Sequence, residues 1–117
     1  MKETVFFVED EWIQRTEITK AFKKQGYVIL DYGNITDAHT AAQNGLHYEL
    51  AIIDRGFERS SMSGDDLMAL SKQLHPDVPI VCLSGSGLKA PYADYHFTKP
   101  IMPSTLINFL EVYVFGK

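Results

Sequence analysis

Residues 50–54, Leu-Ala-Ile-Ile-Asp, form a short apolar run that ends directly on the carboxylate of Asp54. Short runs of this kind between turn signals are typical of buried parallel strands. Three further apolar runs end on polar groups: Val5–Val8 on Glu9 and Asp10, Pro79–Leu83 on Ser84, and Tyr95–Thr98 on Lys99 and Pro100. If these strands are parallel neighbours, three carboxylates, a hydroxyl and an ammonium converge outside their carboxyl ends, where open α/β sheets bind ligands.

Helical patterns alternate with these runs along the chain. The expected strands are 4–8, 28–31, 50–53, 78–83 and 95–98, and the expected helices are 11–25, a short one ending at Gln43, 65–74, and one from Pro103 to Val114. Thr36 is the expected cap of the short helix, and Ser63 and Asp66 have the spacing of a capping box. Alternating strands and helices predict a right-handed, doubly wound parallel sheet.

Composition bounds the class of protein. A chain of 117 residues, 45% of them hydrophobic, is expected to form one domain. A net charge of -4 gives no electrostatic footprint for nucleic acid. The sequence has no apolar run near the ~20 residues of a membrane span and no signal-peptide layout. A single cysteine, Cys82, fits a reducing compartment and a buried packing role, so the expected location is cytoplasmic.

The carboxylates at the strand ends suit a hard cation. Glu9 and Asp10 are adjacent directly after a buried strand, and Asp54 ends an all-apolar strand with no local helix to cap. Three crowded carboxylates repel one another, and Mg²⁺ relieves that repulsion because it takes oxygen ligands. The alternative for Glu9 and Asp10 is a helix start, where negative charge is favourable.

Two further groups suit a phosphoryl group. Lys99 precedes Pro100, so a rigid turn, with a cis or trans bond, can aim its ammonium at a phosphate oxygen. Ser84 can donate a hydrogen bond to the same group. Taken alone, each residue is as well explained by an ordinary turn or a solvated strand end. No Walker lysine follows the glycines at 85 and 87, which argues against a nucleotide site.

Together these motifs resemble the receiver domain of two-component response regulators, and the resemblance covers essentially the whole chain. It implies a flavodoxin-like (βα)5 fold with a five-stranded, doubly wound parallel sheet. It also implies roles for the residues at the strand ends. Asp54 would be the phosphoacceptor, Mg²⁺ would be held by Glu9, Asp10, Asp54 and the backbone carbonyl of Gly56, and the phosphoryl oxygens would be contacted by Ser84 and Lys99.

The same resemblance implies how the protein works. Asp54 would take a phosphoryl group from a phosphohistidine of a histidine kinase or histidine phosphotransfer protein. The domain would catalyse its own phosphorylation and dephosphorylation and would not be a turnover enzyme. Residues 1–117 are expected to be a single receiver domain without an output domain, so the signal would pass through contacts of the 84–101 region with a downstream protein.

Three departures from the family pattern affect these expectations. The loop after Asp54 lacks the usual Met-Pro and is slightly longer than usual, which bears on the position of Gly56. The switch position three residues before the lysine carries His96, and this residue and Ser84 are the expected switch pair. Only 14 residues separate Ser84 from Lys99, so the family's fourth helix is expected to be reduced or absent.

Loss of that helix predicts a bare apolar edge that serves as a partner surface. The residues expected to line it are Leu88, Tyr92, Tyr95, Phe97 and Ile101. The competing possibility is that the connection folds back over the edge.

Two other functions remain open from the sequence. One is a pseudo-receiver, an interaction module that never takes phosphate. The shortened helix and His96 keep it open, whereas the intact acidic pair, Asp54 and Lys99 argue against it. The other is a phosphohydrolase with an aspartyl nucleophile, against which the absence of a second carboxylate two residues after Asp54 argues.

Overall fold

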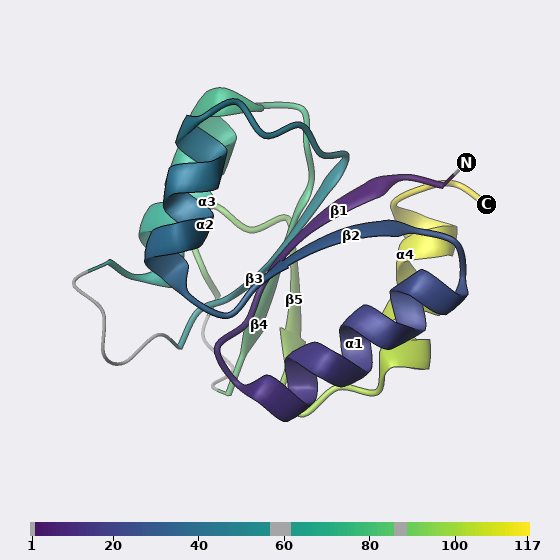
Figure 1. Ribbon diagram of the computed structural model, residues 1–117. Coiled ribbons are helices and arrows are strands. Elements are labelled where there is room, and N and C mark those ends of the chain that lie inside the picture. The colour runs from purple at the N-terminus through teal and green to yellow at the C-terminus, as the bar shows by residue number, and fades with distance from the viewer. Residues whose placement is uncertain (1, 57–61, 86–88) are drawn as a thin grey trace.

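The computed structural model describes residues 2–56, 62–85 and 89–117, which form one sheet with helices on both faces (Figure 1). The elements in chain order are β1 (Thr4–Val8), α1 (Trp12–Lys24), β2 (Val28–Tyr32), α2 (Ile35–Gln43), β3 (Leu50–Asp54), α3 (Gly64–Leu74), β4 (Ile80–Ser84), β5 (Tyr95–Thr98) and α4 (Pro103–Tyr113). Five strands pair in the order β2-β1-β3-β4-β5, all parallel. The predicted doubly wound parallel sheet of flavodoxin-like type is confirmed.

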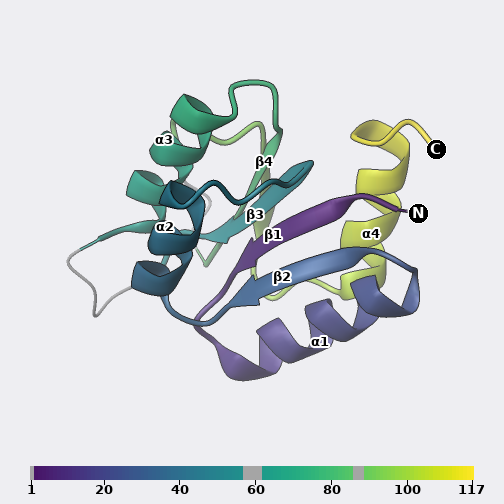
Figure 2. The same cartoon turned by 45° about the horizontal axis from the view of Figure 1, so that its top comes forward.

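Side chains that alternate along the strands feed two separate cores. Phe7 of β1 belongs to the core under α1 and α4, whereas its neighbour Phe6 belongs to the core under α2 and α3. Figure 2 shows the two helix pairs on opposite faces of the sheet. Strands buried on both faces are continuously apolar, which is why the runs were recognisable in the sequence. Because β1, β3, β4 and β5 are parallel, their carboxyl ends meet at one edge.

The caps of two helices fix how the chain enters them. Ser63 and Asp66 form the predicted capping box at the start of α3. For α2 the predicted cap is wrong: Asn34 caps the helix, and its Oδ1 accepts hydrogen bonds from the amides of Thr36 (2.8 Å) and Asp37 (3.2 Å). Thr36 therefore lies inside the first turn, where its amide needs a cap and cannot provide one.

The connection between β4 and β5 contains no helix in the residues described there, 85 and 89–94, in agreement with the expected loss of the family's fourth helix. Ala90 is buried in the core under α2 and α3, and its amide donates a 2.7 Å hydrogen bond to His96 Nε2. Asp94 fastens the other end, since its amide donates to the Ile80 carbonyl and its carboxylate accepts from the Ile80 amide, both at 2.8 Å. The connection therefore folds back onto the sheet.

The expectation of a wholly bare apolar edge is wrong, because α4 covers part of that edge on the other face of the sheet. Tyr95, Phe97 and Ile101 are half-buried against the core under α1 and α4, because the Phe109 ring of α4 lies edge-on to the rings of Tyr95 and Phe97. Tyr92 is exposed, and the predicted Leu88 lies outside the described residues.

The single cysteine has the buried position that composition led us to expect. Cys82 is fully buried in the core under α2 and α3, and burial raises the pKa of its thiol to about 11, as expected for a packing residue. Among the described residues, none of the helices is long and apolar enough to cross a membrane.

Candidate functional site

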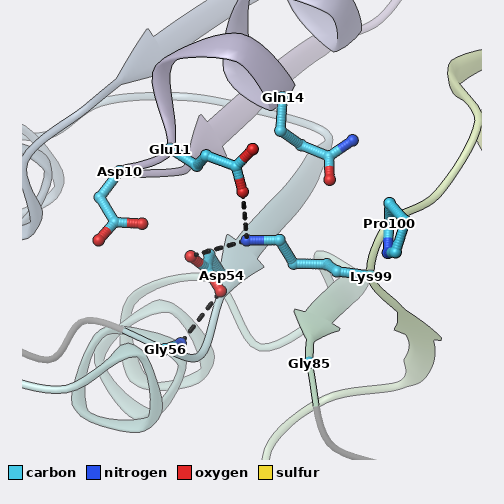
Figure 3. A pocket seen from close by; sticks show the side chains of 8 residues that line it. All are labelled: Asp10, Glu11, Gln14, Asp54, Gly56, Gly85, Lys99 and Pro100. Carbon is cyan, nitrogen blue, oxygen red and sulfur yellow. Dashed lines mark hydrogen bonds and ion pairs between the residues drawn. The ribbon is translucent and has the colours of Figure 1, made fainter.

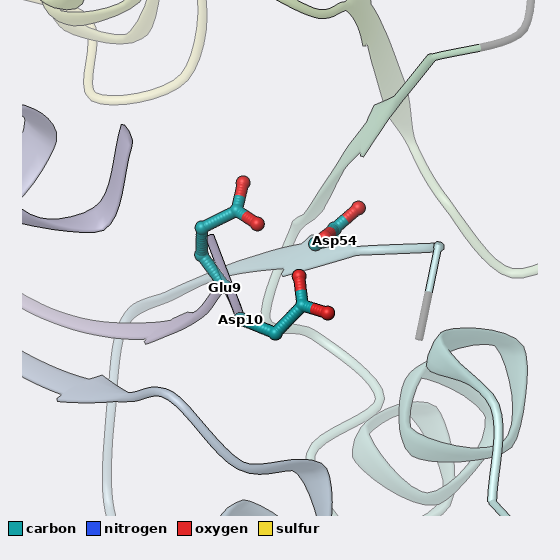
Figure 4. A group of neighbouring side chains, drawn as sticks. All are labelled: Glu9, Asp10 and Asp54. Carbon is teal, nitrogen blue, oxygen red and sulfur yellow. The ribbon is translucent and has the colours of Figure 1, made fainter. Parts of the chain in front are cut away.

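Three carboxylates from two strand ends meet at the carboxyl edge of the sheet (Figure 4). Glu9 and Asp10 follow β1 directly, and Asp54 is the last residue of β3. Each contributes an oxygen that lies within 4.8 Å of the oxygens of the other two. Glu9 and Asp54 are buried while Asp10 is exposed, so the cluster has a protected base and an open rim.

The Lys99 ammonium lies between the two buried carboxylates. Its Nζ is 2.8 Å from Glu9 Oε1. The same atom is 3.3 Å from Asp54 Oδ2 and 4.0 Å from Glu11 Oε2 (Figure 3). The side chains of Lys99, Glu9 and Asp54 are only 16%, 0% and 3% exposed. The Lys99 amide donates to the Ser84 carbonyl at 2.8 Å, and the Lys99–Pro100 bond is cis, one of the forms that the sequence allowed.

The Asp54 carboxylate is held at both of its oxygens. Oδ1 accepts a 3.0 Å hydrogen bond from the amide of Gly56, and Oδ2 accepts from Lys99. The backbone is fixed too, because the Arg55 amide donates to the Leu83 carbonyl at 2.9 Å and the start of α3 packs on it. A Cβ at Gly64 would collide with the Asp54 carbonyl and lie 2.8 Å from Arg55 Cα, so only glycine allows this approach.

The electrostatics follow from burial and crowding. Burial, together with hydrogen bonding to Asp54 and repulsion by its charge, raises the pKa of Glu9 to about 8 despite Lys99. Burial and Asp54 also raise the pKa of Asp10. Burial alone would raise the pKa of Asp54, but hydrogen bonding with Glu9, the Gly56 amide and the charge of Lys99 outweigh it and lower that pKa. For Lys99 the acidic partners outweigh burial and raise the pKa. In the metal-free protein the negative charge is thus favoured most on Asp54.

The raised pKa of Glu9 predicts a pH-dependent stability of the metal-free protein. Between the ordinary value of 4.5 and about 8, the folded state holds a proton that the unfolded chain releases. Stability therefore falls as the pH rises through this window, because the folded state binds more protons than the unfolded one. Melting temperatures in EDTA are expected to be lower at pH 8 than at pH 6. Glu9→Gln should flatten this slope, and an unchanged slope in Glu9→Gln would contradict the assignment.

The donor set fits a magnesium ion. Carboxylate oxygens are the ligands that this hard cation takes, and one or two of them usually suffice beside waters and a phosphate oxygen. Glu9 Oε1 is buried and accepts no hydrogen bond in the described structure, although Lys99 pairs with it as an ion. A cation here would also relieve the crowding that raises the pKa values of Glu9 and Asp10.

An open pocket of about 390 Å³ lies over this cluster (Figure 3). Its lining residues come from four strand ends and the start of α1: Asp10, Glu11, Gln14, Asp54, Gly56, Gly85, Lys99 and Pro100. The pocket therefore joins the open rim of the acidic cluster to the lysine, with room for a small anionic group beside Asp54.

The structure brings most of the predicted site residues together. Asp10, Asp54, Gly56 and Lys99 line the pocket, and Glu9 lies beside Lys99. Ser84 ends β4 as predicted and is buried, but the residue lining the pocket from this strand end is its neighbour Gly85.

The proposed switch residue His96 lies on β5 beside Cys82 of β4, with its ring bonded to Ala90. The roles of Ser84 and His96 stay predictions. Gly87 lies outside the described residues.

Sequence reasoning missed the contribution of the start of α1. Glu11 pairs with Lys99, and Gln14 is buried with its Nε2 donating to the Ile101 carbonyl at 3.2 Å. A helix that begins directly after Glu9 and Asp10 turns its first residues over the same edge of the sheet. The available signal was the spacing of three residues from Glu11 to Gln14, which places both in the first turn of a helix that starts beside the acidic pair.

Comparisons with known proteins agree with this architecture at the level of the fold. No protein-family model matches the chain, and a search of curated proteins found no match. A CheY-like response regulator receiver domain protein from Methanospirillum hungatei superposes with a TM-score of 0.83 at 16% identity, covering 96% of this chain and 93% of that one. Chemotaxis response regulator CheY4 of Vibrio cholerae gives a TM-score of 0.82 at 20% identity, covering 96% and 98%.

A longer protein carries the same fold as a part. NtrX from Brucella abortus superposes with a TM-score of 0.83 at 25% identity, covering 96% of this chain but only 26% of that one. The sheet order, the helix pairs and the strand-end positions of Asp54 and Lys99 are therefore found within a fold shared with response regulators. The resemblance inferred from the strand-end motifs is confirmed at this level: the protein has the fold of a response-regulator receiver domain.

Proposed function

We propose that this protein is a phosphoacceptor signalling domain in which Asp54 takes a phosphoryl group. The observation that carries the proposal is the position of the Asp54 carboxylate, at the base of an open pocket with Lys99 Nζ 3.3 Å from Oδ2. Its lowered pKa keeps it ionised, which a nucleophile requires. The phosphohydrolase alternative lacks a second carboxylate two residues after Asp54, where it would need its general acid.

The reaction is a transfer between two side chains. An Asp54 oxygen forms the new bond to phosphorus as the bond from phosphorus to a histidine nitrogen of the donor protein breaks. That nitrogen keeps the electron pair and takes up a proton. Lys99 neutralises charge on the equatorial phosphoryl oxygens, so positioning and electrostatics supply most of the catalysis. Ser84 is the proposed hydrogen-bond donor to the same oxygens.

The metal proposed for this reaction is Mg²⁺. Glu9, Asp10, Asp54 and the backbone carbonyl of Gly56 would hold it, and bound there it would supply positive charge beside the transferred group. Lys99 already neutralises part of the negative charge of Glu9 and Asp54. Lys99 and the metal would therefore both contribute to neutralising this charge. The acyl phosphate formed on Asp54 is later hydrolysed by water.

The partners follow from this chemistry. The donor would be a histidine kinase or a histidine phosphotransfer protein, and a downstream protein would bind the 84–101 region, with Ser84 and His96 coupling it to Asp54. The protein would act in the cytoplasm and would catalyse only its own phosphorylation and dephosphorylation. The fold shared with chemotaxis regulator CheY4 supports these proposals.

Covalent phosphorylation separates this function from a phosphorylation-independent pseudo-receiver. The full chain incubated with acetyl phosphate and Mg²⁺ is expected to gain one phosphoryl group by intact mass, and EDTA should suppress the gain. An unmodified mass at saturating acetyl phosphate and Mg²⁺ would favour the pseudo-receiver.

A further inference from the structure

Arg15 connects α1 back to the loop that carries the acidic residues. Its Nη1 donates a 3.0 Å hydrogen bond to the backbone carbonyl of Glu9, and its Nε lies 3.5 Å from Asp31 Oδ2 on β2. The side chain is only 21% exposed. Arg15 thus contacts the backbone, and not the carboxylate, of the residue between β1 and Asp10.

Gly33 provides the space that the guanidinium occupies. A Cβ at this position would collide with Arg15 Nη1 and lie 2.7 Å from Cζ. Gly33 directly follows Tyr32, whose carbonyl accepts a 3.0 Å hydrogen bond from the Glu9 amide. The end of β2 therefore holds Glu9 through its amide directly and through its carbonyl by way of Arg15.

We propose that Arg15 is a positioning residue for the metal-binding loop, and that Gly33 supports this contact because it leaves room for the guanidinium. The oxygens of Glu9, Asp10 and Asp54 lie within 4.8 Å of one another, and a displacement of the Glu9–Asp10 backbone away from β3 would separate these proposed ligands. A hydrogen bond from a charged guanidinium to the Glu9 carbonyl opposes that displacement. This inference rests on the proposed Mg²⁺ function of the same cluster.

A positioning role for Arg15 predicts an effect on Mg²⁺ affinity that a purely structural role does not. If Arg15 only anchored α1, its removal would lower the melting temperature and leave the affinity for Mg²⁺ unchanged. If it positions the loop, its removal lowers that affinity, because residues that orient metal ligands typically affect it by about 10- to 100-fold. We expect a value near the lower end, since the carboxylates themselves remain.

A double-mutant cycle tests the pairing of Arg15 with Gly33. Arg15→Met keeps the apolar stem and removes the guanidinium, and Gly33→Ala adds a methyl group that displaces it. Each variant is expected to weaken Mg²⁺ binding about tenfold by calorimetry, and the double variant should bind no more weakly than Arg15→Met alone. Arg15→Lys should fall between wild type and Arg15→Met. Lys20→Met, on an exposed residue of the same helix, is the matched control and should bind as wild type does.

Hydrogen exchange of the metal-free chain provides an independent readout. Backbone amides of residues 9–12 should exchange faster in Arg15→Met and Gly33→Ala than in wild type and Lys20→Met. Unchanged Mg²⁺ affinity and unchanged exchange in Arg15→Met would overturn the proposal, as would an additive loss in the double variant. If wild type bound no Mg²⁺, the proposed function would fail, while the exchange comparison would still decide whether Arg15 and Gly33 hold the loop.

Discussion

Asp54→Asn is expected to abolish covalent phosphorylation by acetyl phosphate while the fold stays intact. The amide has nearly the same shape as the carboxylate and can still accept the hydrogen bond from the Gly56 amide. It carries no negative charge and is not a nucleophile toward phosphorus. Intact mass measured with saturating Mg²⁺ and phosphodonor should therefore show only the unmodified variant.

A matched aspartate shows whether the loss is specific to Asp54. Asp77 is exposed in the turn before β4, at the opposite end of this strand from Ser84, and Asp77→Asn should be phosphorylated as wild type is. Circular dichroism of both variants checks that each remains folded. A phosphoryl group retained by Asp54→Asn would place the acceptor at another residue and remove the basis of the proposed function.

Asp10→Asn is expected to change stability and metal affinity in opposite directions. Burial and the neighbouring Asp54 raise the pKa of Asp10, which means that its negative charge is disfavoured in the metal-free fold. Removing that charge should raise the melting temperature in EDTA. It also removes a proposed oxygen ligand, so we expect Mg²⁺ binding to weaken more than tenfold, about 1.4 kcal/mol or more.

Thermal melts and calorimetry measure the two effects separately. A ligand at 100 times its dissociation constant stabilises a fold by ~2.7 kcal/mol, so Mg²⁺ at that concentration should raise the melting temperature of wild type clearly and that of Asp10→Asn much less. Glu17→Gln, on an exposed glutamate of α1, is the control for a general loss of negative charge. If Asp10→Asn changed neither property, the proposed metal cluster would be wrong.

The sequence by itself determined the sheet and the strand-end positions of the main site residues. Leu50–Asp54 and Ile80–Ser84 are buried at every position, and such strands are visible as continuous apolar runs. Parallel pairing then places Asp54 and Lys99 at one edge whatever the helices do. The predicted start of β4 at Val78 was wrong: the strand begins at Ile80, because Val78 still belongs to the turn, where its amide donates to the His75 carbonyl.

Tertiary structure alone decided how deeply each of these residues is buried and which partner it contacts. Glu9 and Asp10 are adjacent acids in the sequence, yet Glu9 is fully buried against Lys99 and Asp10 is exposed on the rim. The sequence predicted a bare apolar sheet edge where the fourth helix is missing, but the connection before β5 folds back through the hydrogen bond from Ala90 to His96.

The contact of Arg15 with the Glu9 carbonyl likewise depends on the distant residue Gly33. A buried strand can be predicted from an apolar run, because the whole signal lies within a few neighbouring residues. Packing between elements that are far apart in the sequence decides how deeply a single acidic side chain is buried and which residue it pairs with. A local sequence pattern does not contain that information.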